Sequence, residues 1–149
     1  MVAPQKRHSL SRLDALDRDD GENLYVIRGL YKLALGWQDR GHLNAAKTIY
    51  QFIVKVPERT PSVNCEEVTK SMGNLASIFL IQDAFMEAED TFLKAIARCY
   101  ETLGDEHELF ALLLREYACL LRRMGLSDQA QALEQRADQV APANLPVLI

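Results

Sequence analysis

The chain has 149 residues, of which 48% are hydrophobic and 26% are charged, and its formal net charge is −4. This composition is typical of a soluble globular protein, and no apolar run is long enough to span a bilayer, so we expect no membrane partner. The net negative charge argues against nucleic acid as a partner, because dedicated nucleic-acid-binding proteins are usually basic.

The N-terminal segment, residues 1–21, is the first predicted element. Residues 1–8 are expected to be disordered, as chain ends usually are. Leu10, Leu13 and Leu16 follow at helical spacing, which predicts a short capping helix. The segment has basic residues but lacks the apolar stretch of a secretory signal, which favours a cytoplasmic location.

The rest of the chain has the apolar periodicity of α-helices. Apolar residues recur at spacings of three and four, as in Leu75, Ile78 and Phe79, and no proline falls within residues 62–141. The last residues, 141–149, are proline-punctuated and predict an extended tail. The pattern therefore predicts an all-α chain without strands. The six predicted helices cover residues 22–40, 43–56, 63–82, 85–102, 107–124 and 127–140.

The chain aligns with itself at an offset of 42 residues, without a gap. Two alanines recur in each copy, and a glycine or aspartate recurs five residues before the second alanine. Each copy is therefore predicted to be an antiparallel helix pair, with small residues where the helices touch and a turn that requires positive φ. A large apolar residue also recurs, and it predicts a core position for Trp37. The coincident sets are Ala34, Ala76 and Ala118; Trp37, Phe79 and Leu121; Gly41, Asp83 and Gly125; and Ala46, Ala88 and Ala130.

This pattern resembles the tetratricopeptide repeat (TPR) family, and the 42-residue period resembles the repeats of kinesin light chains. "GNLASIF" at residues 73–79 and "LGDEHELFA" at residues 103–111 are similar to motifs of that subclass. The resemblance implies an α-α superhelix, a TPR solenoid of three antiparallel helix pairs, and a helix-capping role for His107. The third copy departs from the pattern at Glu134, because the equivalent residues of the first two copies are the aromatic residues Tyr50 and Phe92. The implied repeats are residues 22–61, 62–103 and 104–140.

The resemblance also implies that the first helix of each pair lines a concave surface that binds extended peptides, with Asn74 hydrogen-bonding the peptide backbone. Six basic and two acidic residues fall on this face by register, which favours an acidic or C-terminal peptide, although charged helix faces are commonly just solvated. Gly73 costs about 1 kcal/mol in a helix relative to alanine, so it predicts a close approach. The candidate groove residues are Arg28, Tyr31, Lys32, Lys70, Asn74, Ser77, Arg115, Cys119, Arg122 and Arg123.

The chemical motifs of common enzymes are absent. No GxxxxGK[ST], GxGxxG or HExxH occurs, and three cysteines without a CxxC pair predict buried thiols, with neither a metal nor a cofactor. We therefore expect a module that binds a protein or peptide. The alternative is a homo-oligomeric scaffold that associates through the first helix, which is apolar on more than one face, or through the C-terminal tail. The apolar face of that helix is expected to be covered by Leu10, Leu13 and Leu16 or by a second chain. An enzyme using Cys119 or His107 ranks last.

Overall fold

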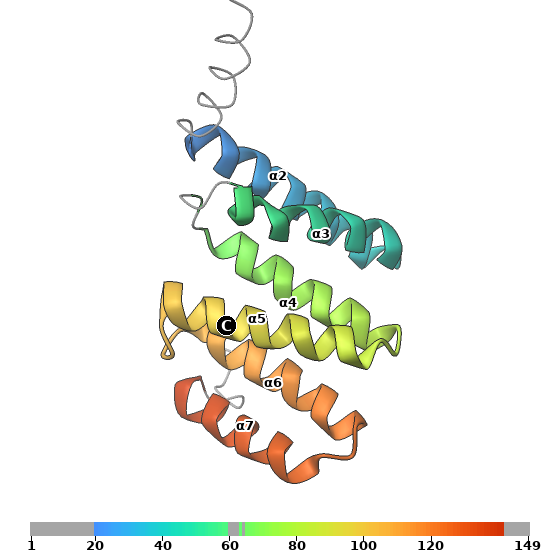
Figure 1. Ribbon diagram of the computed structural model, residues 1–149, viewed down its shortest axis with the longest axis vertical. Coiled ribbons are helices and arrows are strands. Elements are labelled where there is room, and N and C mark those ends of the chain that lie inside the picture. The colour runs from blue at the N-terminus through green and yellow to red at the C-terminus, as the bar shows by residue number, and fades with distance from the viewer. Residues whose placement is uncertain (1–19, 60–62, 64, 142–149) are drawn as a thin grey trace, which may run out of the picture. The chain divides into compact units, whose positions relative to one another are not determined.

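The computed structural model describes residues 20–59, 63 and 65–141, and in this part of the chain it contains six α-helices and no strand (Figure 1). The all-α prediction is confirmed. The predicted capping helix and the tail beyond residue 141 lie outside the described residues. The chain divides into two compact units, Met1–Glu67 and Val68–Ile149, which are treated separately below. The helices are α2 (Asp20–Asp39), α3 (Leu43–Arg59), α4 (Glu66–Ile81), α5 (Phe85–Leu103), α6 (Glu108–Arg123) and α7 (Ser127–Val140).

Two helix ends differ from the prediction by three residues, and the other ends differ by two or fewer. Helix α3 was expected to end at residue 56 because Pro57 follows, but it continues to Arg59 with Pro57 inside it. Proline fixes φ at a helical value, and in the last turn its missing N–H removes only one backbone hydrogen bond. Helix α4 begins at Glu66, three residues later than predicted, and its first turn carries Glu66 and Glu67, whose charges suit a helix N-terminus.

The turn between the two helices of each pair has the same backbone geometry in all three copies. Gly41, Asp83 and Gly125 have φ values of 82°, 58° and 81°, so the predicted positive φ is confirmed. At the first turn the N–H of Gly41 donates to the carbonyl of Gln38 at 3.0 Å, and the N–H of His42 donates to that of Trp37 at 2.9 Å. This pair of bonds recurs 42 and 84 residues later and is the helix-ending motif in which the terminal residue adopts the left-handed region.

The repeated alanines lie in the helix contacts. Ala46, Ala88 and Ala130 are fully buried, and so are the first-helix alanines of the three copies. In the second unit, Ala88 packs with Phe92, whereas Ala130 packs with Leu121. A larger side chain at any of these positions would push the two helices apart, which explains why the sequence keeps alanine there.

The first unit contains the antiparallel pair α2 and α3. Its core includes Ile27, Tyr50 and Ile53, and the hydroxyl of Tyr50 donates to Oε1 of Gln38 at 2.8 Å. Trp37 was predicted to be a core residue, but it is only half-buried and stacks edge-on against His42, with 5.2 Å between ring centroids.

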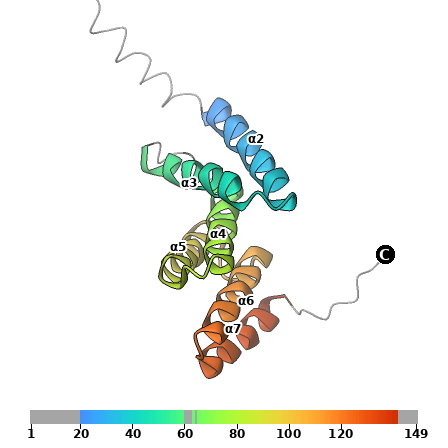
Figure 2. The ribbon, with the colours of Figure 1, turned by 90° about the vertical axis from the view of Figure 1, so that its right-hand side faces the viewer.

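The second unit contains α4, α5, α6 and α7, and Figures 1 and 2 both show α7 lying alongside α6. One of its clusters contains Ala95 and Cys99 of α5 with Leu113 and Leu114 of α6. The prediction of three buried thiols is wrong for one of them, because Cys65 and Cys99 are buried but Cys119 is exposed. Cys119 is on α6, and the described part of the second unit leaves it exposed.

Candidate peptide-binding surface

Helices α4 and α6 approach closely at Gly73. A Cβ atom at this glycine would lie 2.8 Å from Cδ2 of Leu113, which is closer than real carbon contacts allow. The predicted close approach is therefore found, and it comes from α6 within the fold. Helix packing therefore accounts for the glycine at position 73, and no ligand is needed to explain it.

Glu116 is a half-buried carboxyl group at this contact. The hydroxyl of Ser77, on α4, donates to Oε2 of Glu116 at 3.2 Å and lies 3.1 Å from the carbonyl oxygen of Gly73. Burial raises the pKa of the Glu116 carboxyl above its ordinary value, and the Ser77 hydrogen bond offsets part of this rise. Ser77, a predicted groove residue, thus connects α4 to α6.

The three arginines that were predicted to form a basic cluster are held in different directions. Nη2 of Arg115 is 3.0 Å from Oδ1 of Asp138, and the same guanidinium donates to the backbone carbonyl of Ala141. Nε and Nη2 of Arg122 donate to the two carboxylate oxygens of Glu134 at 2.9 and 2.6 Å. These two arginines therefore reach towards α7 and not towards a common anion site.

Arg123 reaches the other way, to the turn between α4 and α5. Its guanidinium pairs with the carboxylate of Asp83 and donates to the carbonyl oxygen of Leu80 at 2.9 Å. It also lies over the ring of Phe85, with 5.1 Å from the guanidinium carbon to the ring centroid. Each of the three arginines thus has one acidic side chain beside it, and the positive charge of this face is largely balanced within the fold.

One strip of α6 is left open by these contacts. Leu112 is 50% exposed, Cys119 is exposed two turns later, and the side chains of Arg122 and Arg123 remain 45% and 46% exposed. The spacings of seven and then three or four residues place these residues along one side of the helix, with the guanidinium groups of Arg122 and Arg123 turned to different neighbours at its end. The strip has an apolar end at Leu112 and a basic end at the two arginines.

The other predicted groove residues have more varied surroundings. Arg28 in the first unit has its Nε 3.3 Å from Oε1 of Glu67, and Lys32 is exposed. The ring of Tyr31 packs against that of Tyr50, with 6.3 Å between centroids. Lys70 and Asn74, on α4, are half-buried.

Sequence reasoning missed the acids that neutralise the arginines, although it contained a signal for one of them. Glu134 stands where the other two copies have Tyr50 and Phe92, and this departure marks the acid that binds Arg122. Asp83 was singled out only for its backbone, and Asp138 not at all. The role of Glu116 as the buried carboxyl became visible only with the packing of α4 on α6.

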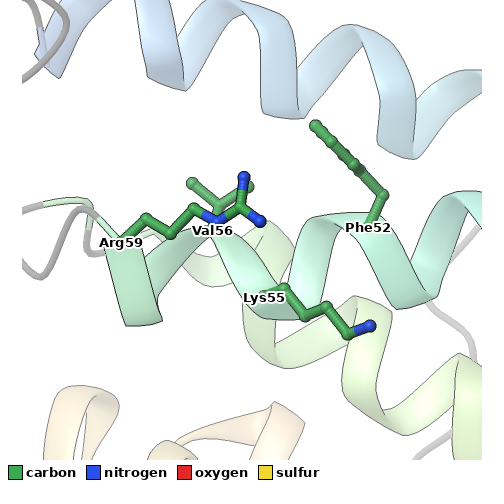
Figure 3. Close-up of a pocket in the computed structure, with 4 residues that line it drawn as sticks. All are labelled: Phe52, Lys55, Val56 and Arg59. Atoms are coloured by element: carbon green, nitrogen blue, oxygen red, sulfur yellow. The ribbon is translucent and has the colours of Figure 1, made fainter. Parts of the chain in front are cut away.

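A separate hollow of about 140 Å3 lies on α3, at residues that the sequence did not single out (Figure 3). Its lining residues, Phe52, Lys55, Val56 and Arg59, have the spacing of a single helix face. Figure 3 shows Phe52 extending towards α2 and Lys55 pointing the opposite way. None of its lining residues is among the predicted groove residues.

The comparisons with known proteins agree with this geometry. A tetratricopeptide repeat family model matches residues 67–141, which is half of the chain. The chain belongs to the tetratricopeptide repeat family. No curated protein sequence matches it.

Solved structures of this family share the fold at low sequence identity. BtubC (BKLC) from P. vanneervenii has a TM-score of 0.73 at 19% identity, over 98% of this chain and 61% of that one. A protein from Podosopora anserina, described as a kinesin light chain with nearly identical TPR-like repeats, has a TM-score of 0.66 at 20% identity, over 80% and 56%. The chain thus spans about three-fifths of the length of these TPR proteins, and the predicted resemblance to kinesin light chains is confirmed.

Of the two residues considered for catalysis, His107 caps a helix and Cys119 is exposed. Nδ1 of His107 accepts the backbone N–H of Leu109 at 3.0 Å, which confirms the predicted cap of α6. Within the described ranges, no group of three or more His, Cys, Asp or Glu side chains is placed to hold a metal ion. None of the described helices is long and apolar enough to cross a membrane.

Proposed function

We propose that this TPR protein is a non-enzymatic interaction module that binds an extended peptide along the open strip of α6. The observation that supports this most is the strip itself, with exposed Leu112 and Cys119 leading to the half-exposed Arg122 and Arg123. Its chemistry fits a peptide with an apolar side chain at one end and a carboxylate, from an acidic side chain or the C-terminus, at the other. Lys70, Asn74 and Ser77 on α4 are proposed to extend this surface within the second unit, and Arg28, Tyr31 and Lys32 on α2 are proposed to contribute peptide-binding residues of the first unit.

The ion pairs are consistent with this role. Glu134 and Asp83 hold the two guanidinium groups in place, so that little side-chain entropy is lost when a ligand binds. A guanidinium has five N–H donors, and the intramolecular pairs of Arg122 use two of them. A ligand carboxylate can therefore add to each pair without breaking it, and a charge-assisted hydrogen bond of this kind is among the stronger ones.

The test is binding of the full chain to an array of synthetic octapeptides. Each peptide is made in two forms, one with a free C-terminal carboxylate and one with an amidated C-terminus. We expect the free acids with apolar side chains to bind, and amidation to weaken them. For the best peptide, Arg122→Gln and Arg123→Gln should each raise the Kd by roughly tenfold in fluorescence anisotropy, which corresponds to one charge-assisted contact.

Arg136→Gln is the matched control. Arg136 pairs with Asp105 at 2.8 Å and is 44% exposed, so it resembles Arg122 in exposure and in having an acidic partner. We expect this variant to bind as the wild type does. An equal loss in the control, a Kd indifferent to amidation, or no binding to any free-acid peptide would each reject the proposed surface.

A further inference from the structure

Helix α2 has an exposed face that combines large apolar residues with glycines. Val26 and Leu33 are 52% and 51% exposed. Gly29 and Gly36 lie between and beyond them, and a Cβ atom at either glycine would meet no described atom within 4 Å. The backbone of α2 is therefore accessible along this face, and the two large side chains project beside it.

The same register positions are packing positions in the third repeat. The equivalent residues of α6, 84 positions later in the sequence, are Phe110, Leu113, Tyr117 and Leu120. Phe110 and Leu113 pack with α5, and Leu120 packs with Phe92 and Ala76, whereas Tyr117 is half-buried beside them. In that repeat the face is filled by the helix pair that precedes it, and α2 presents the corresponding face without a described neighbour.

The residues along this face are complementary to themselves in the antiparallel direction. They follow one another at alternating spacings of four and three, which is the heptad spacing of a two-helix seam. When a second copy of α2 is laid antiparallel, with the two-fold axis at residue 31, each large residue faces a glycine. Glu22, near the start of α2, faces Arg40, which follows the end of the helix and whose guanidinium lies over the ring of Trp37. The facing pairs are Glu22 with Arg40, Val26 with Gly36, and Gly29 with Leu33.

We propose that this face binds a second copy of the chain, through an antiparallel, two-fold symmetric contact between the two α2 helices. Leu33 of each copy fills the space above Gly29 of the other, and Val26 fills the space above Gly36. The glycines allow the backbones to approach closely, and a two-fold contact requires a self-complementary patch of this kind. The terminal Glu22–Arg40 pairs oppose the parallel arrangement, in which like charges would meet. The proposal does not depend on the peptide-binding surface of α6.

The experiment is sedimentation velocity of the full chain over a concentration series. We expect a monomer–dimer equilibrium, weakened by roughly tenfold or more in Gly29→Leu, where two leucines meet, and also in Leu33→Gly, where no side chain fills the gap. The double variant Gly29→Leu/Leu33→Gly exchanges the leucine and the glycine. It therefore restores the pair across the interface, and we expect its dimerisation to recover relative to both single variants.

The face could instead be covered by residues 1–19 of the same chain. The melting temperature of Gly29→Leu, measured at protein concentrations too low for dimerisation, distinguishes this from a second copy. Leucine has a higher helix propensity than glycine, so an open face predicts an unchanged or higher melting temperature. A lower melting temperature would mean that another segment of the same chain occupies the face, and this would overturn the proposal. A wild-type chain that stays monomeric throughout, or a dimer that both single variants leave unchanged, would also overturn it.

Discussion

Helices α2 and α6 are the first helices of their repeats, yet their corresponding faces differ in residue type and in exposure. In α6 the face carries Phe110, Leu113 and Leu120, which are 8%, 1% and 0% exposed. In α2 the face carries two glycines that alternate with two half-exposed side chains, Val26 and Leu33. The residues of α6 fill a gap between helices, whereas those of α2 leave one open. A repeat protein usually covers such an end with polar residues, and α2 keeps apolar ones, which is the pattern of a contact surface.

The contact between the two helices of a pair also differs from repeat to repeat. The hydroxyl of Tyr50 donates to Gln38 in the first pair, and Arg122 binds Glu134 at the same register in the third. In the second pair the two positions are Leu80 and Phe92, which pack in one apolar cluster. A neutral hydrogen bond, an apolar contact and an ion pair thus stand at one place in the fold. The repeat therefore requires a contact between the two helices at this register, and several kinds of side-chain pair supply it.

Overpacking the alanine contacts should have the largest effect. We expect Ala88→Leu and Ala130→Leu each to lower the free energy of unfolding by about 1–3 kcal/mol, because both alanines are fully buried between helices. Urea denaturation monitored by circular dichroism measures this. Ala132→Leu, at an exposed position of α7, is the control and should be close to neutral. Wild-type stability in both buried variants would show that the 42-residue register does not mark packing positions.

Alanine at the two kinds of glycine should have opposite signs. Gly73→Ala places a Cβ against Leu113, and we expect a net loss of about 1 kcal/mol after the gain in helix propensity. Gly29→Ala adds a Cβ in open space, and we expect a gain of about 0.5–1 kcal/mol when the chain is monomeric. Thermal denaturation at low protein concentration compares the two. A loss in both variants would contradict the difference drawn between α2 and α4.

Two of the glutamates in the second unit, Glu116 and Glu134, should respond oppositely to pH. Burial raises the pKa of Glu116 in the folded state, so its ionisation is penalised there and its contribution to stability falls as the pH rises through that pKa. The Arg122 hydrogen bond lowers the pKa of Glu134, so the stability from this pair is present at neutral pH and is lost as the pH falls through the lowered pKa.

Glutamine variants make this difference measurable. At neutral pH, Glu116→Gln should be more stable than the wild type and Glu134→Gln less stable, and both differences should shrink as the medium becomes acidic. Urea denaturation across a pH series provides the free energies of unfolding. Differences of the same sign in the two variants would contradict the assigned environments.

The internal repeat made much of the fold predictable from the sequence. The features that depend on packing between elements could not be predicted in this way. The turn residues and the buried alanines are local requirements that recur every 42 residues, so one sequence with three copies reveals them. The partners of Arg115 and Arg123 lie 23 and 40 residues away on other elements, and a helix face drawn from the register cannot show them. The exposure of Cys119 and the half-burial of Trp37 likewise depend on which neighbours each helix has.

Exchanging the contact of one repeat for that of another should have the smallest effect, and it tests the comparison of the three pairs most directly. The double variant Arg122→Leu/Glu134→Phe places the Leu80–Phe92 contact of the second repeat at the corresponding positions of the third. Exposed ion pairs contribute little to stability, whereas two apolar side chains can bury each other at this register. We therefore expect the double variant to be at least as stable as the wild type.

Each single variant should be less stable than the double, because it leaves an ion or an apolar side chain without its counterpart. Free energies of unfolding for the four proteins form a double-mutant cycle, and the expected coupling is favourable. Strictly additive effects would mean that the two positions do not form a pair in the third repeat, and that the equivalence of the three contacts is coincidental.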